Sequence, residues 1–400
     1  MKKEFNRKVL KNGLTILFEK RKLPVVSVAF AARHGGINES SEEKGISHFI
    51  EHLLYKGTEK RNSKQIAEEI ERNGGELNGF TSDVVTAFWC KMPSSQINVA
   101  LDVLGDMIKN PKFDEKEIEK ERKVIFEEIK MYHDNPRLHV FEEMHKSLFK
   151  APFGIPLIGT IESMNSINRE KMVEKFKKVY TPNNLILVVI GDAKFEDVVS
   201  FAEKNFGNEK SKIKQFKVKN KNEIHTEKRK GIDQANMIFA YHTPLMNDKK
   251  SYAAKVLSTL MAGGMSSRLF SEIREKRNLA YAVKGDCQIG KDFSYNYIYI
   301  GTTKENVEKV KKLILEEFEK VSKNLTEKEM NEVKKQIIGN YKISMEDSQG
   351  VMVELLLHEV DGNAEEFYEL EKKISEVKLK DVKDLAKIKD YSLFTLMPQE

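Results

Sequence analysis

The segments of the second half of the chain follow the same order as those of the first half, and this repeat limits the fold more than any other feature. In both halves, short apolar and β-branched runs alternate with longer runs of helical spacing. Residues 114–118, Asp-Glu-Lys-Glu-Ile, resemble residues 326–330, Thr-Glu-Lys-Glu-Met, at an offset of 212. Each segment opens with a residue type that caps helices. The pattern therefore predicts two similar halves, each mixing helices and strands.

The fold class that we expect is α+β, with two structurally repeated α/β halves, each a mostly antiparallel sheet packed with helices. A chain of 400 residues is longer than a single hydrophobic core usually supports, which agrees with two halves. We place the first half at residues 1–208 and the second at 231–400. The charged, sparsely apolar stretch 209–230 is expected to be a linker between them.

Helices and strands can be placed from the spacing of apolar residues. One long helical pattern runs from 114 to about 150, and Pro136 is expected to break or kink it. The other expected helices are 42–55, 63–73, 96–109, 169–180, 251–261, 268–276, 305–322 and 326–344, with one more starting at Phe195. The expected strands are 15–19, 25–32, 76–81, 84–91, 185–190, 237–242, 280–288 and 295–302.

Composition excludes several classes of partner and site. The net charge of +6 comes from 68 basic and 62 acidic residues, a nearly balanced surface that does not favour nucleic acid. The two cysteines, Cys90 and Cys287, argue against a disulfide framework or a cysteine zinc site and favour a reducing cytoplasm. Residues 1–8 are basic but precede no apolar run of signal-peptide length, and no window approaches a membrane span. We therefore expect a cytoplasmic protein with no membrane partner.

The strongest chemical signal is the sequence His-Phe-Ile-Glu-His at residues 48–52. Positions i, i+3 and i+4 share one face of a helix, so His48, Glu51 and His52 should point the same way. Two histidines at this spacing can bind one zinc ion, and a catalytic zinc usually has a third protein ligand. The simpler interpretation is a polar face on a half-buried helix. The apolar stripe needed for burial is separate from that face and consists of Ile46, Phe49, Ile50, Leu53 and Leu54.

Residues 45–58 resemble the signature of the pitrilysin-type metallopeptidases, in particular the mitochondrial processing peptidase-like branch with its short bacterial members. In that family the third ligand belongs to a downstream Glu-Arg pattern followed by a second Glu seven residues after the first. Glu121 and Glu128 match this pattern. The resemblance implies one Zn²⁺ per chain, held by His48, His52 and Glu128, with Glu51 as the base and Glu121 orienting a ligand. Without the resemblance, both glutamates would be interpreted as surface charges on a helix.

Two further segments are similar to functional segments of the same family. Residues 267–281 are similar to its carboxy-terminal segment with an Arg/Tyr pair, which implies that Arg274 and Tyr281 polarise the scissile carbonyl. Without the family, they would be a surface charge and a core aromatic. Residues 74–82 resemble the strand along which these peptidases hold a substrate main chain, so Asn78, Gly79 and Phe80 are candidate substrate-binding residues.

The resemblance implies a clamshell around a chamber and a zinc-dependent endopeptidase that hydrolyses peptides or unfolded segments enclosed there. Because the second half has no His-x-x-Glu-His sequence, only the first half should bind the metal. One alternative is a catalytically inactive core or scaffold subunit of the same fold, and another is a zinc-binding module that captures extended peptides without cutting them. The intact motifs favour the peptidase. We expect a peptide partner and a possible homodimer.

Overall fold

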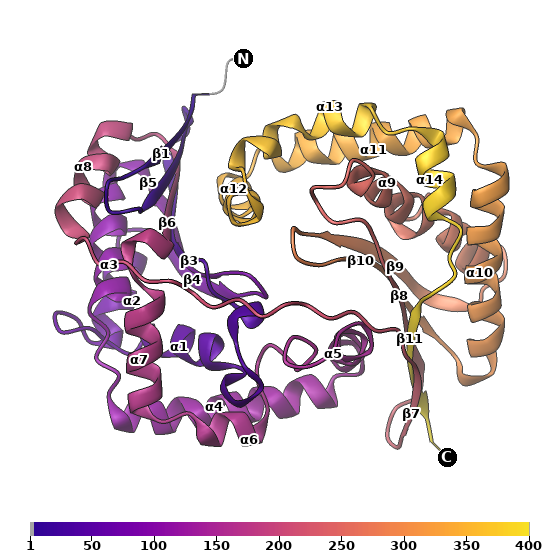
Figure 1. The fold of residues 1–400 in the computed structure, drawn as a ribbon, viewed down its shortest axis with the longest axis horizontal. Coiled ribbons are helices and arrows are strands. Elements are labelled where there is room, and N and C mark those ends of the chain that lie inside the picture. The colour runs from indigo at the N-terminus through magenta and orange to yellow at the C-terminus, as the bar shows by residue number, and fades with distance from the viewer. Residues whose placement is uncertain (1–3, 400) are drawn as a thin grey trace. The chain divides into compact units, whose positions relative to one another are not determined.

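The structure is a computed structural model that describes residues 4–399 and contains two compact units, each built on its own sheet (Figure 1). The first unit comprises the chain up to Ile129 together with Pro156–Phe216 and Ser344–Phe367. The second unit comprises Lys130–Ile155, Lys217–Ile343 and the chain from Tyr368 onwards. Each unit therefore draws on both halves of the sequence.

The sheet of the first unit has six strands, and its two central strands are almost wholly buried. Their order is β1 (Phe5–Val9), β2 (Thr15–Lys20), β6 (Leu185–Gly191), β3 (Val25–Ala32), β5 (Thr86–Pro93) and β4 (Glu76–Thr81). Only the pair β2 and β6 is parallel. Every residue of β6 is buried, which explains its unbroken apolar sequence. Strand β4 lies at the edge of the sheet.

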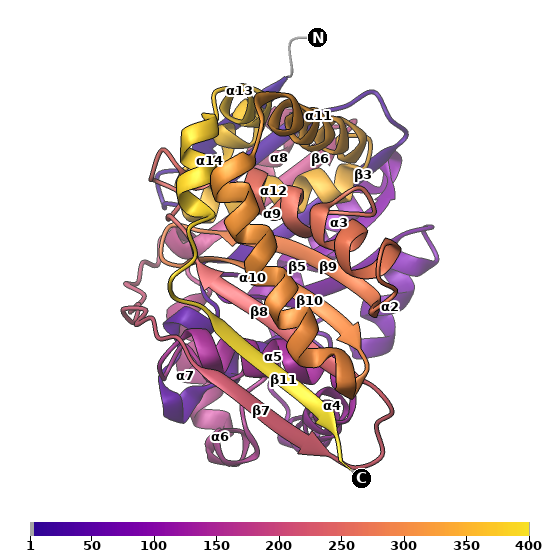
Figure 2. The same cartoon turned by 90° about the vertical axis from the view of Figure 1, so that its right-hand side faces the viewer.

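The sheet of the second unit repeats this arrangement with five strands (Figure 2). Their order is β7 (Ile224–Arg229), β11 (Ser392–Pro398), β8 (Ala235–His242), β10 (Ser294–Thr302) and β9 (Ala280–Ile289). Only β7 and β11 are parallel, at the position where β2 and β6 are parallel in the first sheet. Strand β9 takes the edge position that β4 has. The predicted repeat of two mostly antiparallel sheets with helices is confirmed.

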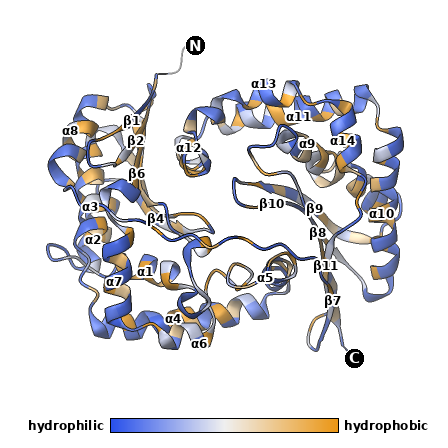
Figure 3. Ribbon diagram, viewed as in Figure 1, coloured by the Kyte–Doolittle hydropathy of each residue, from blue (hydrophilic) through white to orange (hydrophobic). Residues whose placement is uncertain are grey.

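Helices pack on each sheet and are more hydrophilic than the strands, which form the more hydrophobic layer (Figure 3). In the first unit the helices include α1 (Ile46–Leu54), α2 (Ser63–Glu71), α3 (Ile97–Lys109), α6 (Ile161–Ser166), α7 (Arg169–Val179) and α8 (Phe195–Asn205). In the second they include α9 (Ser251–Ala262), α10 (Val307–Asn324), α13 (Leu370–Ser375) and α14 (Leu379–Leu385). Among the described residues, no helix combines the length and the apolar composition required to cross a bilayer.

The two units exchange one helix each. Helix α4 (Glu115–Asp134) is followed at Pro136 by α5 (Pro136–Leu148), which packs on β8 and β11 of the second unit. Helix α11 (Glu327–Ser344) is followed by α12 (Ser348–Asp361), which packs on β3 and β6 of the first unit. The starts of α5 and α12 differ by 212 residues, the offset of the sequence repeat. The compact units consequently differ from the segments 1–208 and 231–400.

Several elements differ from the expectation. Residues 224–229, expected to lie in a linker, form the edge strand β7, whose mostly exposed side chains give no apolar alternation. Residues 114–150 form two helices, because Pro136 begins a new helix as predicted. The expected helix 268–276 contains a π-helical segment, Phe270–Glu275. Strand β1 and all elements after residue 344 were not predicted.

Glu359 of α12 attaches this exchanged helix to the first sheet. Its carboxylate, 2% exposed, accepts hydrogen bonds from Arg7 Nε and Nη2 at 2.8 and 2.9 Å and from Arg33 Nη2 at 3.0 Å. Burial acts to raise the pKa of Glu359, but hydrogen bonds from the two guanidinium groups outweigh it and lower that pKa. Arg7 and Arg33 are therefore paired with a negative charge only while the Glu359 carboxylate is ionised.

We expect Glu359→Ala to lower the free energy of unfolding by about 3 kcal/mol, because two partly buried arginines lose their shared anion. Urea unfolding at pH 7 measures the change. Glu354→Ala, on the exposed face of the same helix, is the control and should change stability by less than about 0.5 kcal/mol. Equal effects of the two substitutions would contradict this role of Glu359.

Candidate metal centre and active site

Helix α1 presents its two faces to different surroundings. The apolar stripe, Ile46, Phe49, Ile50, Leu53 and Leu54, is at most 2% exposed. The start of the helix is fixed by the buried carboxylate of Glu39, which accepts hydrogen bonds from the backbone N–H groups of Gly45 and Ser47 at 3.1 and 2.8 Å. A negative group at this helix end also interacts favourably with the helix dipole. The buried stripe and the fixed start hold the opposite face in one orientation.

That opposite face brings together the three predicted ligands. Glu128 Oε2 lies 3.7 Å from His48 Nε2 and 3.6 Å from His52 Nε2. Within residues 4–399, these three form the single group of His, Cys, Asp or Glu side chains whose ligand atoms lie close enough to hold a metal ion. Two atoms bound at about 2.1 Å to a tetrahedral ion are about 3.4 Å apart, so a small rearrangement suffices.

The donor atoms of this cluster fit a divalent cation. Glu128 Oε2 is buried and has no hydrogen-bond partner, although it faces two imidazole nitrogens. A buried carboxylate oxygen without a partner is unfavourable, and a cation would satisfy it. Burial, and second the charge of His52, lower the pKa of His48 to about 3, so this imidazole is neutral at pH 7 and can donate a lone pair. Two imidazoles and one carboxylate are a donor set that zinc accepts.

Glu121 contacts the cluster through the ring nitrogen of His52 that does not face Glu128. Its Oε2 lies 3.1 Å from His52 Nδ1, and its Oε1 lies 2.8 Å from Lys56 Nζ. A proton on Nδ1 shared with Glu121 leaves the Nε2 lone pair of His52 free for a metal, which is the usual arrangement for a histidine ligand. The predicted role of Glu121 in orienting a ligand is compatible with this contact. Lys56, just beyond the end of α1, was missed because a lone lysine carries no recognisable spacing.

Glu51 is held beside the cluster and beside the edge strand β4. Thr81 Oγ1 donates a hydrogen bond of 2.6 Å to Glu51 Oε2. Burial raises the pKa of Glu51 despite this hydrogen bond. A Cβ atom at Gly79 would lie 2.5 Å from the Tyr55 hydroxyl and 2.8 Å from the main-chain oxygen of Ala87, so β4 packs this closely against Tyr55 only because residue 79 is glycine. The contribution of Thr81 could not be seen in the sequence.

The three candidate substrate-binding residues, Asn78, Gly79 and Phe80, all lie on β4. This strand pairs with β5 on one side only and is therefore an edge strand in the first sheet. Asn78 Oδ1 accepts a hydrogen bond of 2.8 Å from Gly79 N. Free main-chain groups on a sheet edge can pair with an extended peptide. Their contact with a substrate stays a prediction.

Arg274 and Tyr281 lie together in the second unit. Arg274 Nη1 donates a hydrogen bond of 2.9 Å to the main-chain oxygen of Tyr281, and its guanidinium group lies 5.0 Å from the ring centre of Phe270. Tyr281 is 47% exposed on β9, so it is not a core aromatic. A partly exposed tyrosine side chain can donate a hydrogen bond to a ligand. Their action on a scissile carbonyl stays a prediction.

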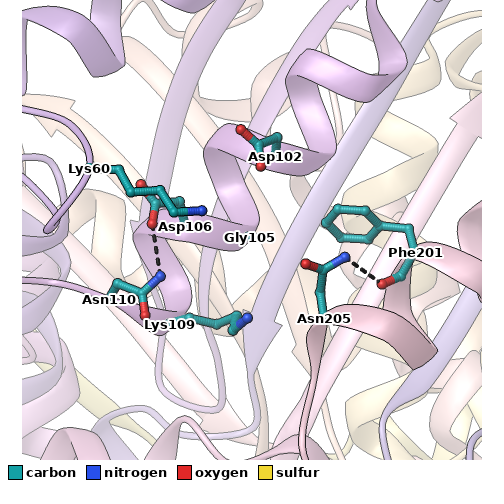
Figure 4. Close-up of a pocket in the computed structure, with 8 residues that line it drawn as sticks. All are labelled: Lys60, Asp102, Gly105, Asp106, Lys109, Asn110, Phe201 and Asn205. Carbon is teal, nitrogen blue, oxygen red and sulfur yellow. Dashed lines mark hydrogen bonds between the residues drawn. The ribbon is translucent and has the colours of Figure 1, made fainter.

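A small pocket in the first unit lies apart from these residues (Figure 4). It is lined by Lys60, by residues of α3 and by Phe201 and Asn205 of α8, and its volume is about 20 Å³. This volume accommodates about one water molecule. Inside it, Asn110 donates to Asp106 Oδ1 at 2.8 Å. The pocket is too small for a substrate and contains none of the predicted site residues.

His34 makes the stability of the first unit depend on pH. It is 3% exposed, and its Nδ1 lies 2.9 Å from Ser47 Oγ of α1. Burial, with a smaller contribution from the Lys175 charge, lowers the pKa of His34 to about 3, while the unfolded chain has a histidine pKa near about 6.5. Below pH 6.5 only the unfolded state gains the proton, so this contribution destabilises the fold increasingly as the pH falls toward 3.

Replacing His34 with glutamine removes this titration. Between pH 7 and pH 5, we expect metal-free His34→Gln protein to lose about 2 kcal/mol less unfolding free energy than the unchanged protein does. Urea unfolding at both pH values measures the difference. His225→Gln, at an exposed position, is the control and should behave as the unchanged protein. A His34→Gln variant with the original pH dependence would contradict the assignment.

Comparison with known families gives matches over both halves of the chain. Residues 15–161 match the family model described as insulinase (peptidase family M16), and residues 166–337 match the one described as peptidase M16 inactive domain. The cluster of His48, His52 and Glu128 lies within the first match. The second match contains no His-x-x-Glu-His sequence.

Similar proteins and structures span nearly the whole chain. An uncharacterized zinc protease of Rickettsia felis is 35% identical over 86% of this chain and 85% of its own length. The uncharacterized zinc protease YmxG of Bacillus subtilis is 32% identical over 98% of both chains. A crystal structure of a protease from Helicobacter pylori has a TM-score of 0.93 at 22% identity and covers 99% of this chain and all of its own. A putative M16-like peptidase from Alicyclobacillus acidocaldarius gives 0.87 at 17% identity, covering 100% and 99%, respectively. The last two similarities establish the fold.

Proposed function

This chain belongs to the insulinase family of peptidases, M16, and on that premise we propose that it is a zinc-dependent endopeptidase. The observation that carries the proposal is the buried, unpaired Glu128 Oε2 between the Nε2 atoms of His48 and His52. These residues belong to the part of the chain that matches the peptidase model. The inferred cofactor is one zinc ion per chain.

Glu51 is the general base in this proposal. Zinc held by His48, His52 and Glu128 supplies a Lewis acid that lowers the pKa of water toward neutrality. The Glu51 carboxylate accepts the proton of the attacking water and later gives it to the leaving amine. Thr81 keeps one carboxylate oxygen in place at 2.6 Å, and burial raises the pKa of Glu51 toward the range in which a carboxylate can return a proton.

The proposed substrate is an extended peptide or an unfolded segment of a protein. Strand β4 can receive such a chain on its open edge, with Asn78, Gly79 and Phe80 next to the peptide main chain. Recognition would then depend on the main chain more than on the side chains. Arg274 and Tyr281 donate hydrogen bonds to the oxygen of the scissile carbonyl in this proposal, with the peptide enclosed in a chamber.

A second function, peptide capture without hydrolysis, is favoured by one observation. The family model that matches residues 166–337 is described as an inactive domain. A scaffold or peptide-binding subunit of the same fold would keep the edge strand and would not need the base. Such a subunit would bind a peptide without cleaving it, whereas the peptidase would cleave the bound peptide.

An internally quenched peptide library distinguishes the two functions. We expect fluorescence to rise with the unchanged protein, to stop when a chelator is added, and to return when zinc is restored. Size-exclusion chromatography of the same sample tests whether the protein is a homodimer or a monomer. Binding of peptides without zinc-dependent cleavage would instead support the capture function and would overturn the proposed peptidase.

A further inference from the structure

Tyr281 lies in a local irregularity of the second sheet. Strands β9 and β10 lie side by side (Figures 1 and 2), and their register pairs Gly301 with Ala282 but Thr302 with Ala280. Tyr281 is thus the extra residue of a β-bulge. Bulges change the direction of a side chain relative to a regular strand and are frequent beside active sites. The bulge explains why the Tyr281 ring does not follow the alternation of its strand.

The ring of Tyr281 occupies the space above Gly301. A Cβ atom at residue 301 would lie 2.2 Å from Tyr281 Cζ and 2.3 Å from its hydroxyl oxygen. Because no side chain except hydrogen fits there, Gly301 forms a seat for the hydroxyl end of the ring. The backbone of Gly301 itself is not in the left-handed region, so the close contact, and not strain, requires glycine.

The Tyr281 hydroxyl also has a buried partner. It interacts with the hydroxyl of Tyr299, which is two residues before Gly301 on β10 and 4% exposed. Tyr299 in turn donates to Asn236 Oδ1 at 2.6 Å. Because Tyr299 uses its one phenolic proton in this bond, its oxygen is left to act toward Tyr281 as an acceptor. The ring of Tyr299 is held by Phe141, at 6.1 Å between ring centres, and by the Arg137 guanidinium at 5.4 Å.

We propose that Tyr299 and Gly301 are positioning residues that hold the hydroxyl of Tyr281 in place for the proposed hydrolysis. Tyr281 is half exposed, and its ring would otherwise sample several rotamers. The rigid partner Tyr299 and the seat at Gly301 select one of them. Rotation about the Cζ–O bond then turns the proton from Tyr299 toward a carbonyl oxygen without moving the ring. This inference rests on the proposed function, because Tyr299 acts only through Tyr281.

A double-mutant cycle tests the role of Tyr299. We expect Tyr299→Phe to lower kcat about 10- to 100-fold with little change in KM, because a donor displaced by a small distance loses most of its effect on the transition state. In a Tyr281→Phe background, the same substitution should change kcat by less than about twofold. Tyr297→Phe is the matched control, because it removes a hydroxyl from the same strand without a contact to Tyr281, and it should leave kcat unchanged.

Gly301 is tested by stability, which does not require activity. Gly301→Ala should lower Tm when Tyr281 is present and should not lower it together with Tyr281→Ala, since the ring is then absent. Equal shifts in both backgrounds would overturn the seat at Gly301.

The kinetic outcomes separate this inference from the proposed function. Equal losses of kcat from Tyr299→Phe in both backgrounds, or no loss in either, would overturn the inference and leave the peptidase intact. Absence of any zinc-dependent cleavage by the unchanged protein would overturn the proposed function and this inference with it.

Discussion

Replacing Glu51 with glutamine is expected to lower kcat for peptide hydrolysis by about 10²- to 10⁴-fold while zinc remains bound. Glutamine has the shape of glutamate and can still accept the hydrogen bond from Thr81, which is 2.6 Å long in this structure. It cannot accept a proton from water at neutral pH. Hydrolysis of a quenched peptide, together with zinc content measured on the same sample, gives both results.

The matched control is Glu71→Gln, an exposed glutamate of α2, which should retain full activity. It removes the same charge from the same unit without touching the metal cluster. Near-normal turnover of zinc-loaded Glu51→Gln protein would mean that another group takes the proton, and the assignment of the base would be wrong.

Replacing Glu128 with alanine is expected to weaken zinc binding by more than about 100-fold. Removing only a hydrogen-bond partner of a metal ligand weakens binding by up to about 100-fold, and the loss of a ligand itself should cost more. The residue supplies the only carboxylate of the three-residue cluster found among the described residues. Competition with a chromophoric chelator measures the affinity. Peptide hydrolysis should fall in parallel at limiting zinc.

Substitutions at two neighbouring glutamates provide comparisons for the zinc affinity of Glu128→Ala. Glu127→Ala, on the exposed side of α4, should leave the zinc affinity unchanged. Glu121→Gln should weaken it by about 10- to 100-fold, because a neutral amide replaces the charged partner that fixes the Nδ1 proton of His52. If Glu127→Ala released zinc as readily as Glu128→Ala did, the choice between these neighbours would be contradicted.

The elements that carry the candidate site could be predicted because local spacing determines them. Helical periodicity alone placed His48, Glu51 and His52 on one face, and the structure brings Glu128 to them. The choice of Glu128 required the family resemblance, because no local rule tells which distant carboxylate meets a given helix. Pro136 was correctly expected to interrupt the helix 114–150, since it fixes its own backbone angle and lacks an N–H group.

Long-range features could not be predicted from the sequence. The exchange of α5 and α12 between the units depends on which sheet each helix covers, and both helices are only weakly amphipathic, so their sequences do not indicate the face that packs. Strand β7 has an exposed, charged sequence and is a strand only because β11, near the end of the chain, pairs with it. Lys56 and Thr81 lie beside predicted residues, but their contacts depend on tertiary structure. The boundaries of the compact units depend most on such long-range contacts.

The position of the metal tests the central claim most directly. Crystals of the zinc-loaded protein, measured with X-rays on both sides of the zinc absorption edge, reveal zinc by its anomalous scattering. We predict one peak per chain in the first unit, about 2.0–2.2 Å from the Nε2 atoms of His48 and His52 and from a carboxylate oxygen of Glu128. Zinc bound at other residues, with the Glu128 carboxylate directed away from both imidazoles, would contradict the account.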